Sequence, residues 1–407
     1  MSESASRAVE TVARNSYGRL VAYLAARSGD LAGAQDALSD AFSSALQRWP
    51  ADGVPQKPEA WLLHAARNRL IDSARHNEVR KRVEPLLQIA AEATEVAAMH
   101  LTFPDERLKL LFVCAHPAID VMVRTPLMLQ TVLGLDAARI ASAFLVSPSA
   151  MEQRLVRAKK KIHAAGIPFR VPERPEWDER AAYVLDAIYA AYTAGWKSVN
   201  EEGSTQHALA REAIAIGSSL VQLIPDEPEA RGLLALMLHC EARSGARFGL
   251  HGDFVPLDRQ ETNRWSRSII DEAEEHLRAA AALRRIGRYQ LEAAIQSIHA
   301  HRAVSGVIDW GEIVLLYEGL VRLAPTAGAQ VGRAVALAES GDPLAGLRAL
   351  EAISPNRTAN YQPWWAARAH ILLRLGRNAE ASDAFRHAAA LTDDPALRAY
   401  LLERAAL

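Results

Sequence analysis

A chain of 407 residues is long enough for two or three domains of about 100–200 residues each. Half of its residues are apolar, 6% are aromatic and the formal net charge is −1, a composition that favours an all-helical protein with an ample core. No apolar run approaches the ~20 residues of a membrane span, the first residues lack an apolar signal core, and two cysteines exclude a disulfide framework. We therefore expect a cytoplasmic protein. Although the net charge is near zero, the segments 75–82 and 154–161 are basic. The net charge therefore does not exclude nucleic acid as a partner.

The first amphipathic pattern ends at a Ser-Gly-Asp break, and a helix is predicted over 31–49. Its apolar residues recur every three to four positions, which predicts one buried face. The opposite face carries Gln35, Asp36, Ser39 and Asp40. Asp36 and Asp40 are one turn apart and have no basic residue four positions away, so they should form an exposed acidic ridge. Such a ridge is either a solvated face or a contact for another protein.

A long helix with a basic end is predicted over 58–82. Its apolar side includes Trp61, which we assign to the core. Its other side carries donors for phosphates and planar groups for base edges, namely Arg67, Asn68, Arg69, Asp72, Arg75 and His76. Taken alone, this side could also be a charged face that only meets solvent.

Two runs in this part of the chain carry a family resemblance. GDLAGAQDALSDAF (29–42) and KPEAWLLHAARNRLIDSARH (57–76) resemble the second conserved domain of extracytoplasmic-function (ECF) sigma factors of bacterial RNA polymerase. In that family the acidic helix docks on the polymerase's largest subunit, and the second helix recognises and opens the −10 promoter element. The resemblance implies that Asp36, Ser39 and Asp40 contact core polymerase. It also implies that the −10 DNA is contacted by Asn68, Arg69, Asp72, Arg75 and His76.

A helix-turn-helix is predicted near residue 150. Asp136 can cap a short helix, and Ser147-Pro148 starts a second, basic one. This pattern places the second helix in the major groove, and the segment resembles the fourth conserved domain of the same sigma factors, which reads the −35 element. We expect bases to be read by Ser149, Gln153 and Arg154. Phosphates should be held by Arg157, Lys159, Lys160 and Lys161.

Two other segments contain residue types that can form a metal or catalytic site. Cys114 lies in an apolar run with no second ligand pair at metal-binding spacing, so we assign it to the core. The polar loop 248–265 carries His251, Asp253, Asp258 and Arg264, which could form a site or satisfy one another at the base of the loop. No nucleophile with its base is evident, and we expect no enzyme activity, cofactor or metal.

The remainder of the chain has the pattern of helical hairpins. Around Trp365 and Gly376, bulky and small residues alternate as in tetratricopeptide repeats, and Gly341 stands about one ~34-residue repeat earlier. Such hairpins stack into a solenoid with a concave surface, which suggests a protein or peptide partner there. The whole half resembles the C-terminal extension of one ECF branch.

The expected fold is therefore all-α: two small helical domains that bind polymerase and DNA, the second a helix-turn-helix, followed by a tetratricopeptide-like solenoid. The expected domains are 7–82, a linker over 83–102, 103–165, a Pro-rich connector over 166–176, and 177–407. The resemblance implies a sigma factor that binds core RNA polymerase and double-stranded and locally melted promoter DNA, with no membrane partner. The fused C-terminal domain would regulate it. The alternatives are a helix-turn-helix regulator with a peptide-sensing repeat domain, and a tetratricopeptide scaffold that does not bind DNA.

Overall fold

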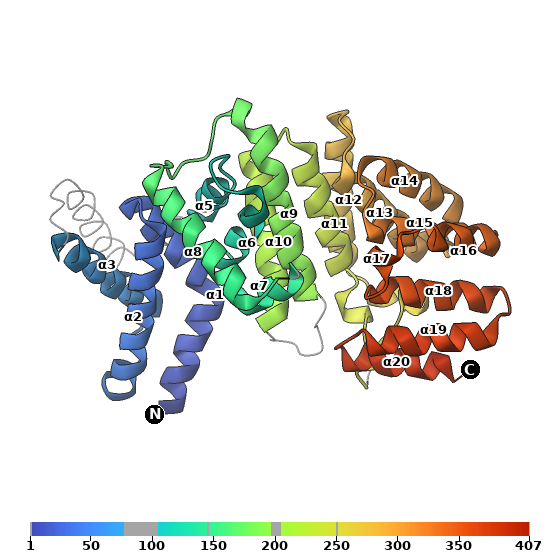
Figure 1. Ribbon diagram of the computed structural model, residues 1–407, viewed down its shortest axis with the longest axis horizontal. Helices are drawn as coiled ribbons and strands as arrows, with labels where there is room; N and C mark the ends of the chain where they lie inside the picture. Colours follow the sequence, from blue (N-terminus) through green and yellow to red (C-terminus); the bar gives the residue numbers. More distant parts are fainter. Residues whose placement is uncertain (1, 77–104, 145, 197–204, 250, 407) are drawn as a thin grey trace. The chain divides into compact units, whose positions relative to one another are not determined.

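The computed structural model describes residues 2–76, 105–144, 146–196, 205–249 and 251–406, and within these ranges the chain is built from helices (Figure 1). The extended pairing among the described residues is one isolated bridge between Phe248 and Phe254. The predicted all-α fold is confirmed. The predicted linker over 83–102 lies outside the described residues.

Two compact units make up the chain, Met1–Gly195 with His207–Ile216 (unit 1) and Trp196–Gln206 with Gly217–Leu407 (unit 2). The helices of unit 1 are α1 (Ser2–Ser28), α2 (Leu31–Asp52), α3 (Pro58–His76), α5 (Arg107–Cys114), α6 (Val121–Thr131), α7 (Ala137–Ala143), α8 (Pro148–Ala164), the 3-10 helix η2 (Arg174–Glu176), most of α9 (Trp177–Trp196) and part of α10 (Thr205–Leu223). Unit 2 holds the rest of α10 and α11 (Pro228–Glu241), η3 (Ser244–Ala246), η4 (Leu257–Arg259), η5 (Thr262–Arg264), α12 (Arg267–Ala282), α13 (Arg288–Ser305), α14 (Trp310–Leu323), α15 (Ala327–Glu339), α16 (Pro343–Glu351), α17 (Pro355–Thr358), α18 (Gln362–Arg374), α19 (Asn378–Ala390) and α20 (Pro395–Ala405).

Helices α1, α2 and α3 pack against one another as a bundle at the start of unit 1. Helix α2 begins where predicted, because the Asp30 carboxylate accepts a hydrogen bond from the Gly33 amide at 3.0 Å. Leu38 and Leu62 are fully buried between the helices. Trp61 is half-buried and meets the buried Trp49 edge to face, with ring centroids 5.5 Å apart.

Helices α5, α6 and α8 pack directly on the bundle, and α7 packs on α6 and α8. The backbones approach closely at Gly18 of α1, where a Cβ would overlap the carbonyl oxygen of Val132 at the end of α6. Helix α8 starts as the sequence predicts: Ser147 accepts from the Ala150 amide at 3.3 Å and Pro148 is the first helical residue. Cys114 is fully buried, and burial raises its pKa to about 12. It is a core residue.

Unit 1 continues beyond residue 165, where the sequence places the end of the second domain. The physical reason is the buried Arg124 of α6. Its guanidinium lies 3.5 Å from the Glu179 carboxylate and 4.6 Å from the centre of the Tyr183 ring, and both residues belong to α9. The first helix after the Pro-rich connector is therefore part of the same compact unit as α7 and α8.

Unit 2 is a run of helical hairpins with solenoid-like packing. Glu229 of α11 accepts hydrogen bonds from the backbone amides of Tyr289 and Gln290 at 2.8 and 3.1 Å, which ties α11 to the start of α13. Helices α15, α16 and α18 share one apolar core, and α18, α19 and α20 stack in succession at the red end of the chain (Figure 1). Gly341 and Gly376 form the turns of two hairpins at φ of 111° and 72°, a region open to glycine.

Candidate functional site

The acidic ridge consists of Asp36, Ser39 and Asp40, and α2 presents all three to solvent. The helix turns its buried face, including Leu31, Ala34 and Leu38, toward the bundle. This arrangement matches the helical periodicity of the sequence, and it leaves two carboxylates free of the core and accessible to a protein partner.

Arg69 of α3 brings the predicted polymerase-binding and −10 residues together. Its Nε lies 3.7 Å from the Asp40 Oδ2, and both side chains are more than half exposed. An exposed pair of this kind contributes little to stability, about 0–1 kcal/mol. It shows that the acidic ridge and the polar side of α3 are adjacent, which sequence spacing could not reveal because the partners lie on different helices.

The polar side of α3 is smaller than the sequence suggests. Asn68 and Asp72 are exposed, as predicted for residues that meet DNA. Arg67, which the sequence places on the same side, is buried, and its Nη2 donates to the Asn68 Oδ1 at 3.2 Å. Arg67 can therefore position Asn68 from inside the bundle. The predicted −10 contacts Arg75 and His76 belong to α3, but their side chains lie outside the described residues.

Gln35 is buried, although the sequence predicts that it is exposed. The sequence places it on the exposed face of α2, yet it is 7% exposed and lies between three helices. Its Nε2 donates to the Tyr17 hydroxyl of α1 at 3.2 Å, and its Oε1 accepts from the Lys159 ammonium of α8 at 2.7 Å. Lys159, expected to hold DNA phosphate, is thus engaged within the protein. No local pattern signals this contact, because its partners are far apart in sequence.

The other α8 residues that are predicted to contact DNA are accessible from solvent. Ser149, Gln153, Arg157 and Lys160 are exposed and Arg154 is half-exposed, while the opposite face of the helix is buried. Arg154 and Arg157 also line an open groove of about 550 Å³, whose floor includes apolar residues of the segment before α6 and of α6 itself. The helix can therefore present amide and guanidinium groups outward, as reading of base edges requires.

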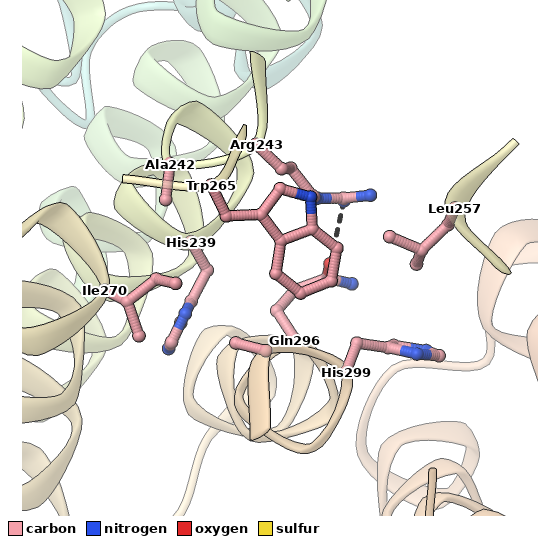
Figure 2. A pocket seen from close by; sticks show the side chains of 9 residues that line it. His239, Ala242, Arg243, Leu257, Trp265, Ile270, Gln296 and His299 are labelled. Atoms are coloured by element: carbon pink, nitrogen blue, oxygen red, sulfur yellow. Dashed lines mark hydrogen bonds between the residues drawn. The ribbon is translucent and has the colours of Figure 1, made fainter. Parts of the chain in front are cut away.

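A small cavity lies inside unit 2 beneath Trp265 (Figure 2). Its volume is about 10 Å³, enough for one water molecule and no larger ligand. Two histidines line it. Burial lowers the pKa of His299 to about 4, and it lowers the pKa of the buried His239 despite the Glu274 carboxylate 3.4 Å away. Both imidazoles are therefore neutral near pH 7.

The loop over 248–265 is held by hydrogen bonds within it and to residues just outside it. Arg264 donates to the carbonyl oxygens of Phe248, at 3.2 Å, and of Gly245. The Gly249 amide donates to the Asp253 carbonyl oxygen at 2.9 Å, and Asp258 offers its carbonyl oxygen to Arg302. His251 is exposed. These contacts are made to backbone oxygens and join none of the four side chains to another, while His251 and Asp253 line an open groove of about 540 Å³. The contacts therefore leave both interpretations of the loop open. Among the described residues, no set of three or more His, Cys, Asp or Glu could hold a metal ion.

Comparison with known proteins adds to this geometry. Residues 13–80 match the family model of sigma-70 region 2, and residues 180–281 match a family of unknown function, DUF6596. The chain is 38% identical to an uncharacterized protein of Rhizobium meliloti (strain 1021) over 389 residues, 94% of this chain and 91% of the relative. No solved structure matches. None of the described helices is long and apolar enough to span a bilayer.

The region 2 match covers most of α1 and all of α2 and α3. Helix α2 carries the acidic ridge, and α3 carries the exposed Asn68 and Asp72. Region 2 is the part of sigma-70 factors that binds core RNA polymerase and promoter DNA. The chain therefore belongs to the same family as the Rhizobium meliloti protein, and its N-terminal part is a sigma-70 region 2 with a sigma-factor-like role in transcription initiation.

Proposed function

We propose that the protein is an ECF-type sigma factor with a fused C-terminal regulatory domain. The observation that carries this proposal is the sigma-70 region 2 over 13–80, with its exposed acidic ridge and the polar side of α3 next to it. The ridge would contact core polymerase. Asn68, Arg69 and Asp72, with Arg75 and His76, would capture and hold the opened −10 strand, because strand capture needs polar groups for a base beside cations for the backbone.

The finer assignment to the ECF type rests on a second DNA-binding element. Helices α7 and α8 follow one another along the chain and pack together, and the outer side of α8 exposes Gln153 and Lys160. Gln153, with Ser149 and Arg154, would read the −35 element, while Arg157 and Lys160 would hold phosphates. This pair of elements is what the sequence resemblance to ECF sigma factors implies.

The C-terminal domain would serve as an interaction module. Its hairpins α15–α16 and α18–α19 turn at Gly341 and Gly376, about one tetratricopeptide repeat apart. Stacked hairpins form an extended surface suited to a peptide or a helix. We propose that this domain regulates the sigma part and replaces or supplements a separate anti-sigma factor.

Transcription with purified core RNA polymerase on a library of randomised promoter fragments tests the proposal. We expect transcripts that start downstream of two enriched sequence elements, and none when core polymerase acts alone. Specific DNA binding without initiation would instead indicate a helix-turn-helix regulator. The absence of both activities would indicate a scaffold.

The acidic ridge has its own test. The double change Asp36→Asn and Asp40→Asn should lower the affinity for core polymerase, measured by fluorescence anisotropy, because it removes both ridge carboxylates and keeps their shape. Asp52→Asn is the matched control, since Asp52 is exposed on the same helix about three turns away. Equal affinity of both variants for polymerase would contradict the role of the ridge.

A further inference from the structure

An open groove of unit 2 lies between the loop over 248–265 and the last helix, α20, and its volume is about 540 Å³. Phe254 of the loop lines it and meets the Tyr400 ring of α20 edge to face, with ring centroids 5.5 Å apart. The other apolar residues that line the groove are Val255, Pro256, Ala396 and Ala399. The groove is therefore formed by two segments that are far apart in the sequence and touch at one aromatic pair.

The loop side of the groove is fixed in place by α13. Arg302 of that helix donates to the carbonyl oxygens of Leu257, Asp258 and Gln260 at 2.9, 2.8 and 3.0 Å. Its guanidinium also lies 5.1 Å from the centre of the buried Trp265 ring. Because the loop is tied at three carbonyl groups, the groove exists before a partner arrives, and this lowers the entropic cost of binding.

Side chains of both charge signs line the groove in equal number. Besides the exposed His251, the cations are Arg259 and Arg404, and the anions are Asp253 and Glu403. Within the part of the chain that the structure describes, none of these four forms an ion pair. The two carboxylates would repel a polyanion such as nucleic acid, and the two guanidiniums would repel a basic peptide. A partner that carries both signs fits this groove.

An apolar side chain projects beside the groove. Leu402 of α20 is 48% exposed and lies on the outer side of the helix, one turn after Ala399 and next to Glu403. Helix α20 ends the stack of hairpins, and among the described helices it packs mainly on α19 (Figure 1). The last helix of a solenoid needs a polar outer face if only water covers it, and the exposed Leu402 and Ala399 do not provide one.

We propose that the groove and the outer side of α20 join two copies of this chain in a two-fold symmetric dimer. A two-fold interface brings the same patch of both copies together, so the patch must be complementary to itself. This patch carries a protruding Leu402 beside an apolar groove, and equal numbers of cations and anions. In the dimer, Leu402 of each copy enters the groove of the other, and Arg404 of each copy faces Glu403 of the other. The inference goes beyond the proposed function and does not depend on it.

Sedimentation velocity of the full-length protein over a concentration series tests the dimer. We expect a species of twice the mass of the chain, whose share grows with concentration. Leu402→Asp should raise the Kd of the dimer at least about tenfold, because it places a charge in the apolar groove of each partner. Leu344→Asp is the matched control and should leave the Kd unchanged, since Leu344 is 56% exposed on α16 and lies outside the groove.

Charge reversal on α20 gives a second test, in which binding is first lost and then restored. Each single change, Glu403→Arg or Arg404→Glu, places like charges opposite each other in the dimer and should raise the Kd about tenfold. The double change restores opposite charges at both contacts and should return the Kd to within a few-fold of its original value. Circular dichroism spectra of the variants distinguish a weaker interface from a loss of folding.

Three results would overturn the proposal. A protein that stays monomeric at every concentration up to about 100 μM would exclude a second copy as the occupant, and the groove would then be open to a peptide or another protein. A dimer that Leu402→Asp and Leu344→Asp weaken equally would have its interface elsewhere. A double reversal that binds no more tightly than the single reversals would contradict the facing of Arg404 and Glu403.

Discussion

Gly18→Ala is a sharp test of the packing of unit 1, because two effects of opposite sign meet at this position. Gly18 lies inside α1, where alanine is favoured over glycine by about 1 kcal/mol. In the folded protein, however, the added Cβ would overlap the Val132 carbonyl oxygen and lie 2.8 Å from its carbon. Overpacking usually costs about 1–3 kcal/mol, and here it falls at the upper end because the obstacle is backbone. We expect unit 1 to lose about 1–2 kcal/mol.

The control for this change is Gly319→Ala in α14. There the nearest atom to an added Cβ is a Leu291 methyl carbon at 3.5 Å, an ordinary contact, so the propensity gain should appear as stabilisation of unit 2 by up to about 1 kcal/mol. Hydrogen–deuterium exchange with mass spectrometry across a urea series resolves the two units separately. Stabilisation of unit 1 by Gly18→Ala would refute the close approach of α1 to the end of α6.

Three further predictions concern pH and DNA. Burial disfavours the protonated forms of His239 and His299, so the unfolded chain binds more protons than the folded protein between about pH 6.5 and 4. Unit 2 should therefore lose stability as the pH falls through this window, by roughly 3 kcal/mol for His299. Urea unfolding at a series of pH values measures this loss, which His299→Gln should reduce, and a flat profile would contradict the burial of these imidazoles. Gln153→Ala should relax sequence preference at the −35 element by about 1–3 kcal/mol per lost base contact in competition binding assays. Lys160→Ala should weaken binding to all sequences alike and lower the slope of affinity against salt by about one, and equal losses on every sequence from both changes would argue against base reading by Gln153.

Because α9 packs within unit 1, a truncated variant that lacks the C-terminal domain should end after α9 and not before it. Truncation at the predicted boundary near residue 176 would strip Glu179 and Tyr183 from the buried Arg124 and would leave its guanidinium without its partners on α9. Helix α10 contributes as well, because its Glu212 forms an ion pair with the buried Arg107 of α5. A truncated protein that retains residues up to 216 keeps these contacts, and it is the better form in which to ask whether the repeats regulate transcription.

The sequence by itself determined where α2, α3 and α8 begin and which of the apolar residues of α2 and α8 are buried. Leu38 on α2 and Leu155 on α8 are buried as their spacing predicts, and Asp30 and Ser147 cap the helices that follow them. These features depend on side chains within one or two turns of each other, so a single stretch of sequence contains all the information needed. The exposure of Asp36, Asp40 and Gln153 follows in the same way, since each lies opposite an apolar face.

Only the tertiary structure decided which polar side chains are exposed to solvent and which are buried by another helix. Gln35 and Asp36 are neighbours on a helix that looks polar at both positions, yet Gln35 is buried by α1 and α8 while Asp36 meets solvent. Arg67 is buried, and Lys159 is held by Gln35 rather than left for DNA. The physical reason is that helical periodicity fixes the direction of a side chain around its own axis, whereas burial depends on which distant helix packs there.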